Sequence, residues 1–434
     1  MHARATAPAD AAMTAPHASP SPDPHAPPPG TQGDATAGAD AVDAPAHDLL
    51  RTPPLSLYVH LPWCVRKCPY CDFNSHEFRG GGAPPFEAYV DALLADLDHD
   101  LPLAWGRTVH SVFFGGGTPS LFPAQAIDRF LQQASARLRF APGAEITLET
   151  NPGTAEHGRM ADYRRAGVNR ISFGVQTFDD ACLQRLGRIH DAAQARQAIA
   201  QAQDAGLDNL NLDLMYALPG QSPDMALHDI EQALSLAPAH VSHYQLTLEP
   251  NTVFAARPPA GLPDEDAAWD MQERCQARLA EGGYAQYETS AYAQPGRRCA
   301  HNLNYWEFGD YLGVGAGAHG KLTLGAEGRI LRRWKVKHPG QYVATAGGAA
   351  AIGGDEDLDA TRRPFDFMLN ALRLNEGFAL ATFTARTGLP AAAIAPQLGK
   401  AEARGWIEPV HGHVRPTELG RRFANDVIGL FLAG

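Results

Sequence analysis

The chain has few charged residues and few cysteines for its length, and it contains no long apolar run. Only 19% of its 434 residues are charged, and the net charge is −12. This acidic balance argues against nucleic acid as a partner, because a polyanion is bound by clustered Lys and Arg. No run of 18 apolar residues occurs, so we expect no transmembrane helix. Six cysteines are too few for a disulfide scaffold and point to a reducing compartment.

The first 50 residues differ in composition from the rest of the chain. They contain 15 Ala and 9 Pro, with six Asp and a single Arg. They show neither the apolar core of a signal peptide nor the Arg-rich, acid-poor texture of a transit peptide, so we expect a cytoplasmic protein. Such a segment cannot bury enough apolar surface to offset its ordering entropy. We therefore expect residues 1–50 to be a disordered tail, with a partner-docking arm as the alternative.

After residue 54, short apolar runs alternate with amphipathic helical patterns such as 89–101 and 192–205. This alternation predicts βαβ units and a parallel sheet. Six units within about 200 residues favour an α/β fold of the partial (β/α)6 barrel type. The apolar runs are residues 55–60 (LSLYVH), 109–114 (VHSVFF), 145–149 (EITLE), 168–175 (VNRISFGV), 207–214 (LDNLNLDL) and 241–248 (VSHYQLTL).

The rest of the chain predicts a second, smaller domain. We expect the barrel and its extension to occupy residues 51–345 and a linker rich in Gly, Ala and Asp to occupy 346–360. Residues 361–434 show three helical patterns, a short hairpin with a turn at His411 and Gly412, and a last helix, an order that resembles a winged helix. Such a domain could bind DNA, but its third helix carries few basic residues. We therefore expect a packing or lid module.

Three cysteines lie within eight residues, in the pattern C-x3-C-x2-C. They are Cys64, Cys68 and Cys71, and they follow the first predicted strand. Thiolates are the preferred ligands of iron–sulfur clusters, and three of them leave one iron of a four-iron cluster open to a small chelating molecule. A zinc site completed by His60 or His76 is the alternative.

Polar residues and glycines follow the other predicted strands. The sequence Gly-Gly-Gly-Thr-Pro at 115–119 follows the second strand, and Glu149 ends the third. Glycines at a strand end allow backbone to approach a ligand closely, because no Cβ is in the way. In an α/β barrel the carboxyl ends of the strands carry the chemistry, so we expect the site there.

Together these motifs resemble the radical S-adenosylmethionine (SAM) superfamily. The resemblance implies a [4Fe-4S] cluster held by Cys64, Cys68 and Cys71, with SAM bound to the open iron. It also implies SAM contacts from residues at successive strand ends. These residues are Tyr58, Tyr70, Gly116, Gly117, Thr118, Glu149, Gln176, Arg188 and Asp213.

Within that superfamily, residues 55–430 resemble the oxygen-independent coproporphyrinogen III oxidase family. Its members include a dehydrogenase, which decarboxylates two propionates during haem synthesis, and haem chaperones. The dehydrogenase usually has a fourth cysteine where this chain has Phe73, which disfavours that activity and leaves open whether the chain is an enzyme. The alternative remains an oxygen-independent coproporphyrinogen III dehydrogenase.

The chaperone branch is favoured by a second motif, H-N-x-x-Y-W, at residues 301–306. An imidazole can ligate haem iron, and aromatic side chains offer flat surfaces to a porphyrin. The resemblance thus implies haem as cargo with His301 as its ligand, Cys299 as a rival ligand, and a buried structural histidine as the alternative. It also implies apo-haem acceptor proteins as partners, among them membrane or respiratory proteins. An iron–sulfur regulator bound to DNA is a third and more distant hypothesis.

Overall fold

The computed structural model describes residues 49–154 and 159–432, and it places one large sheet at the centre of the chain. Neighbouring strands from β11 to β8 run parallel, and antiparallel strands extend both edges. In spatial order the strands are β14 (Ile352–Asp357), β13 (Arg329–Lys335), β12 (His319–Leu324), β11 (Asp310–Val314), β1 (Leu55–Leu61), β4 (Thr108–Gly116), β5 (Arg139–Thr150), β6 (Arg170–Gln176), β7 (Leu210–Tyr216), β8 (His240–Gln245), β10 (Ala291–Ala293) and β9 (Ala285–Glu288).

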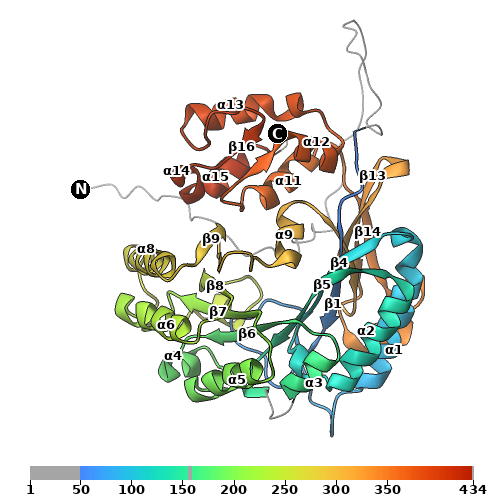
Figure 1. Cartoon of the computed structure of the whole chain (residues 1–434), viewed down its shortest axis with the longest axis vertical. Coiled ribbons are helices and arrows are strands. Elements are labelled where there is room, and N and C mark those ends of the chain that lie inside the picture. The colour runs from blue at the N-terminus through green and yellow to red at the C-terminus, as the bar shows by residue number, and fades with distance from the viewer. Residues whose placement is uncertain (1–48, 155–158, 433–434) are drawn as a thin grey trace, which may run out of the picture.

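Helices follow six of the parallel strands, β1 and β4 to β8, and cover the outer face of the curved sheet (Figure 1). The partial (β/α)6 barrel is therefore confirmed, and each predicted apolar run overlaps one of these six strands. The helices are α1 (Phe86–Asp100), α2 (Ala124–Arg137), α3 (Arg159–Arg165), α4 (Asp180–Arg185), α5 (Ala192–Asp204), α6 (Pro223–Ser235) and α8 (Glu265–Glu281). Among the described residues, no helix combines the length and apolarity needed to cross a bilayer.

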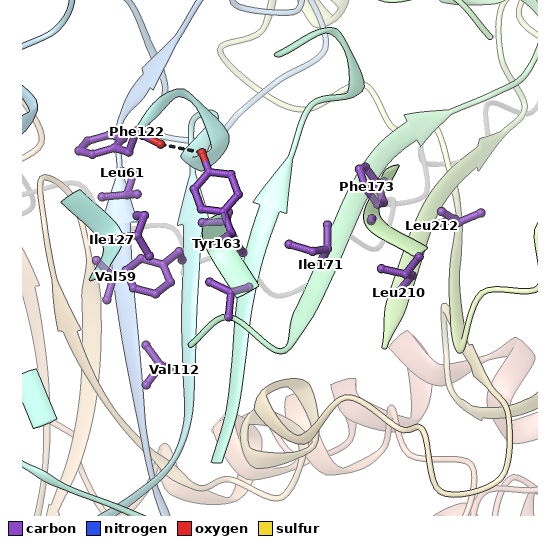
Figure 2. Packing of buried hydrophobic residues seen from close by; sticks show 14 of the residues in the cluster. Val59, Leu61, Val112, Phe122, Ile127, Tyr163, Ile171, Phe173, Leu210 and Leu212 are labelled. Atoms are coloured by element: carbon purple, nitrogen blue, oxygen red, sulfur yellow. Dashed lines mark hydrogen bonds between the residues drawn. The ribbon is translucent and has the colours of Figure 1, made fainter. Parts of the chain in front are cut away.

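Side chains on β1 alternate between the two faces of the sheet, as the two-residue period of a strand requires. Leu57 and Val59 are fully buried against the covering helices, whereas Tyr58 faces the barrel interior. Figure 2 shows this outer core, where Ile127 of α2 lies near Val59 and the Tyr163 hydroxyl donates a hydrogen bond of 2.6 Å to the Phe122 carbonyl. Burying each such side chain contributes about 1.5–3 kcal/mol, so this layer holds the strand ends in place.

The predicted linker at 346–360 is wrong in one part, because it contains β14, which pairs antiparallel with β13. The two glycines and three acidic residues of β14 suggest a loop when only the composition is considered. Their partners lie on the neighbouring strand, where Arg329 pairs with Asp357 and Arg333 pairs with Asp355. Cross-strand ion pairs and an exposed edge therefore explain a strand without an apolar pattern.

The C-terminal domain packs at the amino ends of the barrel strands, away from the cysteine loop. The Arg51 amide, just before β1, donates to the Ala385 carbonyl at 2.7 Å, and Leu50 belongs to the apolar core of this domain. Figure 1 shows the domain beside α9 (Ala300–Trp306). The domain is thus a packing module at the amino end, not a lid over the cysteines. Its elements are α11 (Arg363–Ala371), β15 (Phe378–Ala379), α12 (Leu380–Thr387), α13 (Ala395–Ala403), β16 (His413–Val414), α14 (Glu418–Arg422) and α15 (Ala424–Gly429).

A buried ionic network joins β13 to α1. The ammonium group of Lys335 contacts the carboxylates of Asp96 and Asp100, and the side chains of all three residues are 1% exposed. The Tyr342 hydroxyl, on α10 (Pro339–Thr345), donates to Asp96 at 2.7 Å, and Arg333 pairs with Asp100 at 2.6 Å. Two cations thus balance two carboxylates, as buried charges require.

Replacing the buried lysine should destabilise the fold. The substitution Lys335→Met leaves two carboxylates short of their cation, and breaking a buried pair in this way costs about 3–5 kcal/mol. The matched control is Lys337→Met, at an exposed site two residues away, which should change stability by less than about 0.5 kcal/mol. Urea unfolding of both variants tests this, and equal losses would contradict a special role for Lys335.

Candidate functional site

The three clustered cysteines lie on the segment that leaves the carboxyl end of β1. This segment begins with β2 (Trp63–Cys64) and ends with β3 (His76–Glu77), and the two short strands pair with each other. The side-chain amide of Asn74 anchors the segment by donating 2.9 Å hydrogen bonds to the carbonyls of Ala316 and Lys337. A segment that is paired at both ends and anchored by Asn74 can hold its side chains in fixed positions.

The thiols of Cys64, Cys68 and Cys71 are close enough to influence each other's ionisation. Burial raises the pKa of Cys64 to about 11, and the neighbouring charges of Cys71 and Cys68 add to this rise. All three cysteines are unpaired, as are Cys182, Cys275 and Cys299 elsewhere in the fold. A bound metal or cluster would supply the positive charge that three neighbouring thiolates need.

The histidines of the zinc alternative are engaged elsewhere. The two ring nitrogens of His60 contact the Tyr58 hydroxyl and the Asn74 carbonyl at 3.0 Å, and His76 contacts the Asn74 side chain at 3.1 Å. Across residues 49–154 and 159–432, no three His, Cys, Asp or Glu side chains converge as a single metal ion requires. A multinuclear cluster spreads its ligands over several irons, so the chemistry of the three thiols fits it better than zinc.

The glycine run ends β4 and meets the start of the cysteine segment. Gly116 has a φ of +112°, and a Cβ there would lie 2.4 Å from the His60 ring. A Cβ on Gly117 would lie 2.7 Å from the Pro62 backbone, and the Thr118 amide donates to the Trp63 carbonyl at 2.8 Å. Gly116 and Gly117 therefore allow a close approach, as expected, but the groups that they approach are the His60 ring and the protein's own backbone.

Two carboxylates face each other inside the carboxyl end of the barrel. Burial and the charge of Asp213 raise the pKa of Glu149 to about 8, while the Gly116 amide donates to Glu149 at 3.3 Å. Burial also raises the pKa of Asp213, although Ser172 and Asn211 donate to it at 2.9 and 2.8 Å. Such paired, desolvated carboxylates mark a site that is built to receive hydroxyl or cationic groups.

Aromatic and polar side chains also lie at this carboxyl end of the barrel. Tyr58 is buried beside Glu149, and both effects raise the pKa of its hydroxyl. Gln176 adopts a left-handed φ of 72° and accepts a 3.1 Å hydrogen bond from the Tyr244 hydroxyl. Tyr70 packs against Phe254, with ring centroids 6.3 Å apart. A strained, buried Gln at a strand end is a feature that functional sites retain.

Arg188 links the cysteine segment to the strand ends. Its guanidinium donates to the Gly174 carbonyl at 2.7 Å and to the Cys68 sulfur at 3.6 Å. Its Nε is buried and has no hydrogen-bond partner among the described residues. The predicted SAM residues therefore meet at one end of the barrel, with a spare buried donor among them.

His301 lies deeper in the barrel interior, with its ring centroid 6.5 Å from that of Tyr58. Its ring nitrogens contact Ser111 at 3.0 Å and Tyr305 at 3.2 Å, and the ring stacks on Phe113 with centroids 4.9 Å apart. Burial lowers its pKa to about 3. Cys299 is equally buried and donates to Glu145 at 3.4 Å. Both nitrogens of the His301 imidazole thus have partners within the protein, as the structural alternative expects, and ligation of haem by His301 stays a prediction.

Three residues of the site were not predicted from the sequence: Asn74, Ser75 and Tyr244. Asn74 anchors the loop, the Ser75 hydroxyl lies 3.4 Å from the Cys71 sulfur, and Tyr244 holds Gln176. The alternation of β8 could have assigned Tyr244 to the interior, since it shares a face with Ser242. No local pattern marks the other two, because their partners lie far away in the sequence or depend on the turn.

Comparison with known proteins agrees with this geometry. The Radical SAM superfamily model matches residues 58–233, and the HemN C-terminal domain model matches residues 358–423. The chain is 51% identical over 385 residues to "Heme chaperone HemW" of Escherichia coli (strain K12), covering 89% of this chain and all of that protein. It is 47% identical over 386 residues to "Heme chaperone HemW" of Haemophilus influenzae, covering 88% of this chain and 99% of that protein.

A solved structure supports the fold. The structure described as "Coproporphyrinogen III oxidase (HemN) from Escherichia coli is a Radical SAM enzyme" superposes with a TM-score of 0.74 at 24% identity, over 89% of this chain and 92% of that one. At this identity the likeness shows a shared fold alone, whereas the two bacterial relatives match along nearly their whole length. This chain therefore belongs to the radical SAM superfamily and, within it, to the HemW family.

Proposed function

We propose that the chain is a haem chaperone, which binds haem and delivers it to apo-acceptor proteins. The observation that carries the proposal is the 51% identity that spans the full length of the E. coli heme chaperone. The position of three cysteines on the segment that follows β1 of a radical SAM barrel agrees with it. Phe73, 37% exposed where a fourth cysteine is usual in the dehydrogenase, favours this function over coproporphyrinogen III oxidation.

The residues at the carboxyl end fit the cofactors of this family. Cys64, Cys68 and Cys71 would hold a [4Fe-4S] cluster through their thiolates. The SAM contacts would come from the predicted residues at the strand ends, with the buried and unpartnered Nε of Arg188 as one available donor. When bound, the cluster and SAM supply one-electron chemistry, while the protein supplies position and charge. Six free cysteines suit the reducing cytoplasm, where we place the protein.

Removing one cluster cysteine should remove the cluster. We expect Cys68→Ser to lose most of its iron and its iron–sulfur absorbance after anaerobic reconstitution, because a serine oxygen is a poor replacement for a thiolate. The matched control is Cys275→Ser, a buried cysteine of α8, which should keep the iron content of the unchanged chain. A Cys68→Ser protein with a full four-iron spectrum would refute the ligand assignment.

Glu149 should lose a proton when SAM binds. In the free protein its pKa is about 8, so the group is mainly protonated at pH 7. The positive charge of SAM favours the carboxylate, so Glu149 should release close to one proton at pH 7 and only about a tenth of one at pH 9. Calorimetry in buffers of different ionisation enthalpy measures this release. The variant Glu149→Gln should abolish it, and persistence of the release in that variant would sink the assignment.

An anaerobic haem titration followed by absorbance tests the chaperone function itself. The unchanged chain should bind haem saturably and form no product from coproporphyrinogen III. Failure to bind haem, together with product formation, would reverse the ranking in favour of the dehydrogenase.

The variant His301→Ala separates the two roles of that residue. Because both ring nitrogens already have partners, we expect unchanged haem affinity and a loss of about 1–3 kcal/mol in the free energy of unfolding. Haem binding weakened tenfold or more at unchanged stability would instead identify His301 as the ligand and require α9 to move. Cys299→Ala is the companion variant for the rival ligand.

A further inference from the structure

Each of the three clustered sulfurs lies beside one hydrogen-bonding group, and the three groups come from different parts of the chain. Two are hydroxyls and one is a guanidinium. An iron-bound thiolate carries no proton, so with a cluster in place both hydroxyls must donate toward sulfur. The pairs are Thr118 Oγ1 with Cys64 at 3.3 Å, Arg188 Nη1 with Cys68 at 3.6 Å, and Ser75 Oγ with Cys71 at 3.4 Å.

These donors are held by the fold and not by the sulfurs alone. Thr118 is buried, and its amide donates to the Trp63 carbonyl at 2.8 Å. Ser75 is buried, and its amide donates to the Phe73 carbonyl at 2.6 Å. Arg188 is fixed by its 2.7 Å bond to the Gly174 carbonyl. Donors that are positioned in advance cost no reorganisation when the charge of the cluster changes.

The charge of the cluster determines whether these donors raise or lower its reduction potential. A reduced cluster carries one more negative charge than an oxidised one, so donors and cations near its sulfurs stabilise the reduced form. Hydrogen bonds to the sulfurs, net charge and solvent exposure are the factors that set such potentials. Arg188 combines a hydrogen bond with a full positive charge, so its effect should exceed that of either hydroxyl.

We propose that Ser75, Thr118 and Arg188 set the reduction potential of the cluster, one donor to each sulfur, with Arg188 making the largest contribution. This inference rests on the proposed function in requiring that the chain holds a cluster. It gives Arg188 a positioning role toward Cys68 in addition to its predicted contact with SAM. It also explains why a hydroxyl residue stands four positions after the last cysteine.

The test is a redox titration of the reconstituted full chain, monitored by electron paramagnetic resonance, with dithionite as the one-electron source. SAM is left out, so the predicted SAM contact of Arg188 cannot contribute. We expect Arg188→Gln to shift the midpoint potential downward, and Thr118→Val and Ser75→Ala to shift it downward by less. The matched control is Arg185→Gln, since Arg185 Nη1 lies 3.9 Å from the sulfur of Cys182, which is not a predicted ligand. This control should leave the potential unchanged.

Iron and sulfide analysis of each preparation keeps the outcomes distinct. A fully loaded cluster with unchanged potential in all three variants would overturn the inference and leave the chaperone function untouched. If the protein without any substitution takes up no cluster, the proposed cofactors themselves are wrong. Should Arg188→Gln fail to fold, Thr118→Val, which keeps the side-chain shape, and Ser75→Ala decide the question.

Discussion

The parallel pairing of β1 with β4 and β11 is the constraint on which the site depends. This pairing brings His60 opposite Gly115 and lets the turn after β4 reach the cysteine segment that follows β1. On the other side, β11 leads to the Ala316 carbonyl, which anchors Asn74. A parallel sheet places the carboxyl ends of its strands at one edge, so segments far apart in sequence become neighbours without any further device.

The two ends of the barrel have different chemistry. The carboxyl end gathers thiols, desolvated carboxylates and Arg188, and burial raises the pKa values of Cys64, Glu149 and Asp213 there. Toward the amino ends of the strands, the Glu145 carboxylate accepts hydrogen bonds from the His301 amide at 3.0 Å and from the Ala300 amide at 3.1 Å, and these bonds hold the start of α9 in place.

Sequence reasoning predicted the barrel and the cysteine segment well because both leave local patterns. The alternation on β1 and the C-x3-C-x2-C spacing need no knowledge of distant partners. Strand β14 was beyond such reasoning, and the motif around His301 could not decide between a haem ligand and a buried structural residue. The stabilising partners of Asp355 and His301 are Arg333 and Ser111, and only the folded chain brings them together. Ligation of haem by His301 therefore stays a prediction.

The position of the C-terminal domain has a practical consequence. Leu50 and Phe431 belong to the same apolar core, so the chain enters and leaves the described structure from one side of the molecule. That side is the one opposite the cysteine segment. A surface linkage or a fluorescent label attached at the carboxyl terminus would therefore lie on the side away from the cysteine segment.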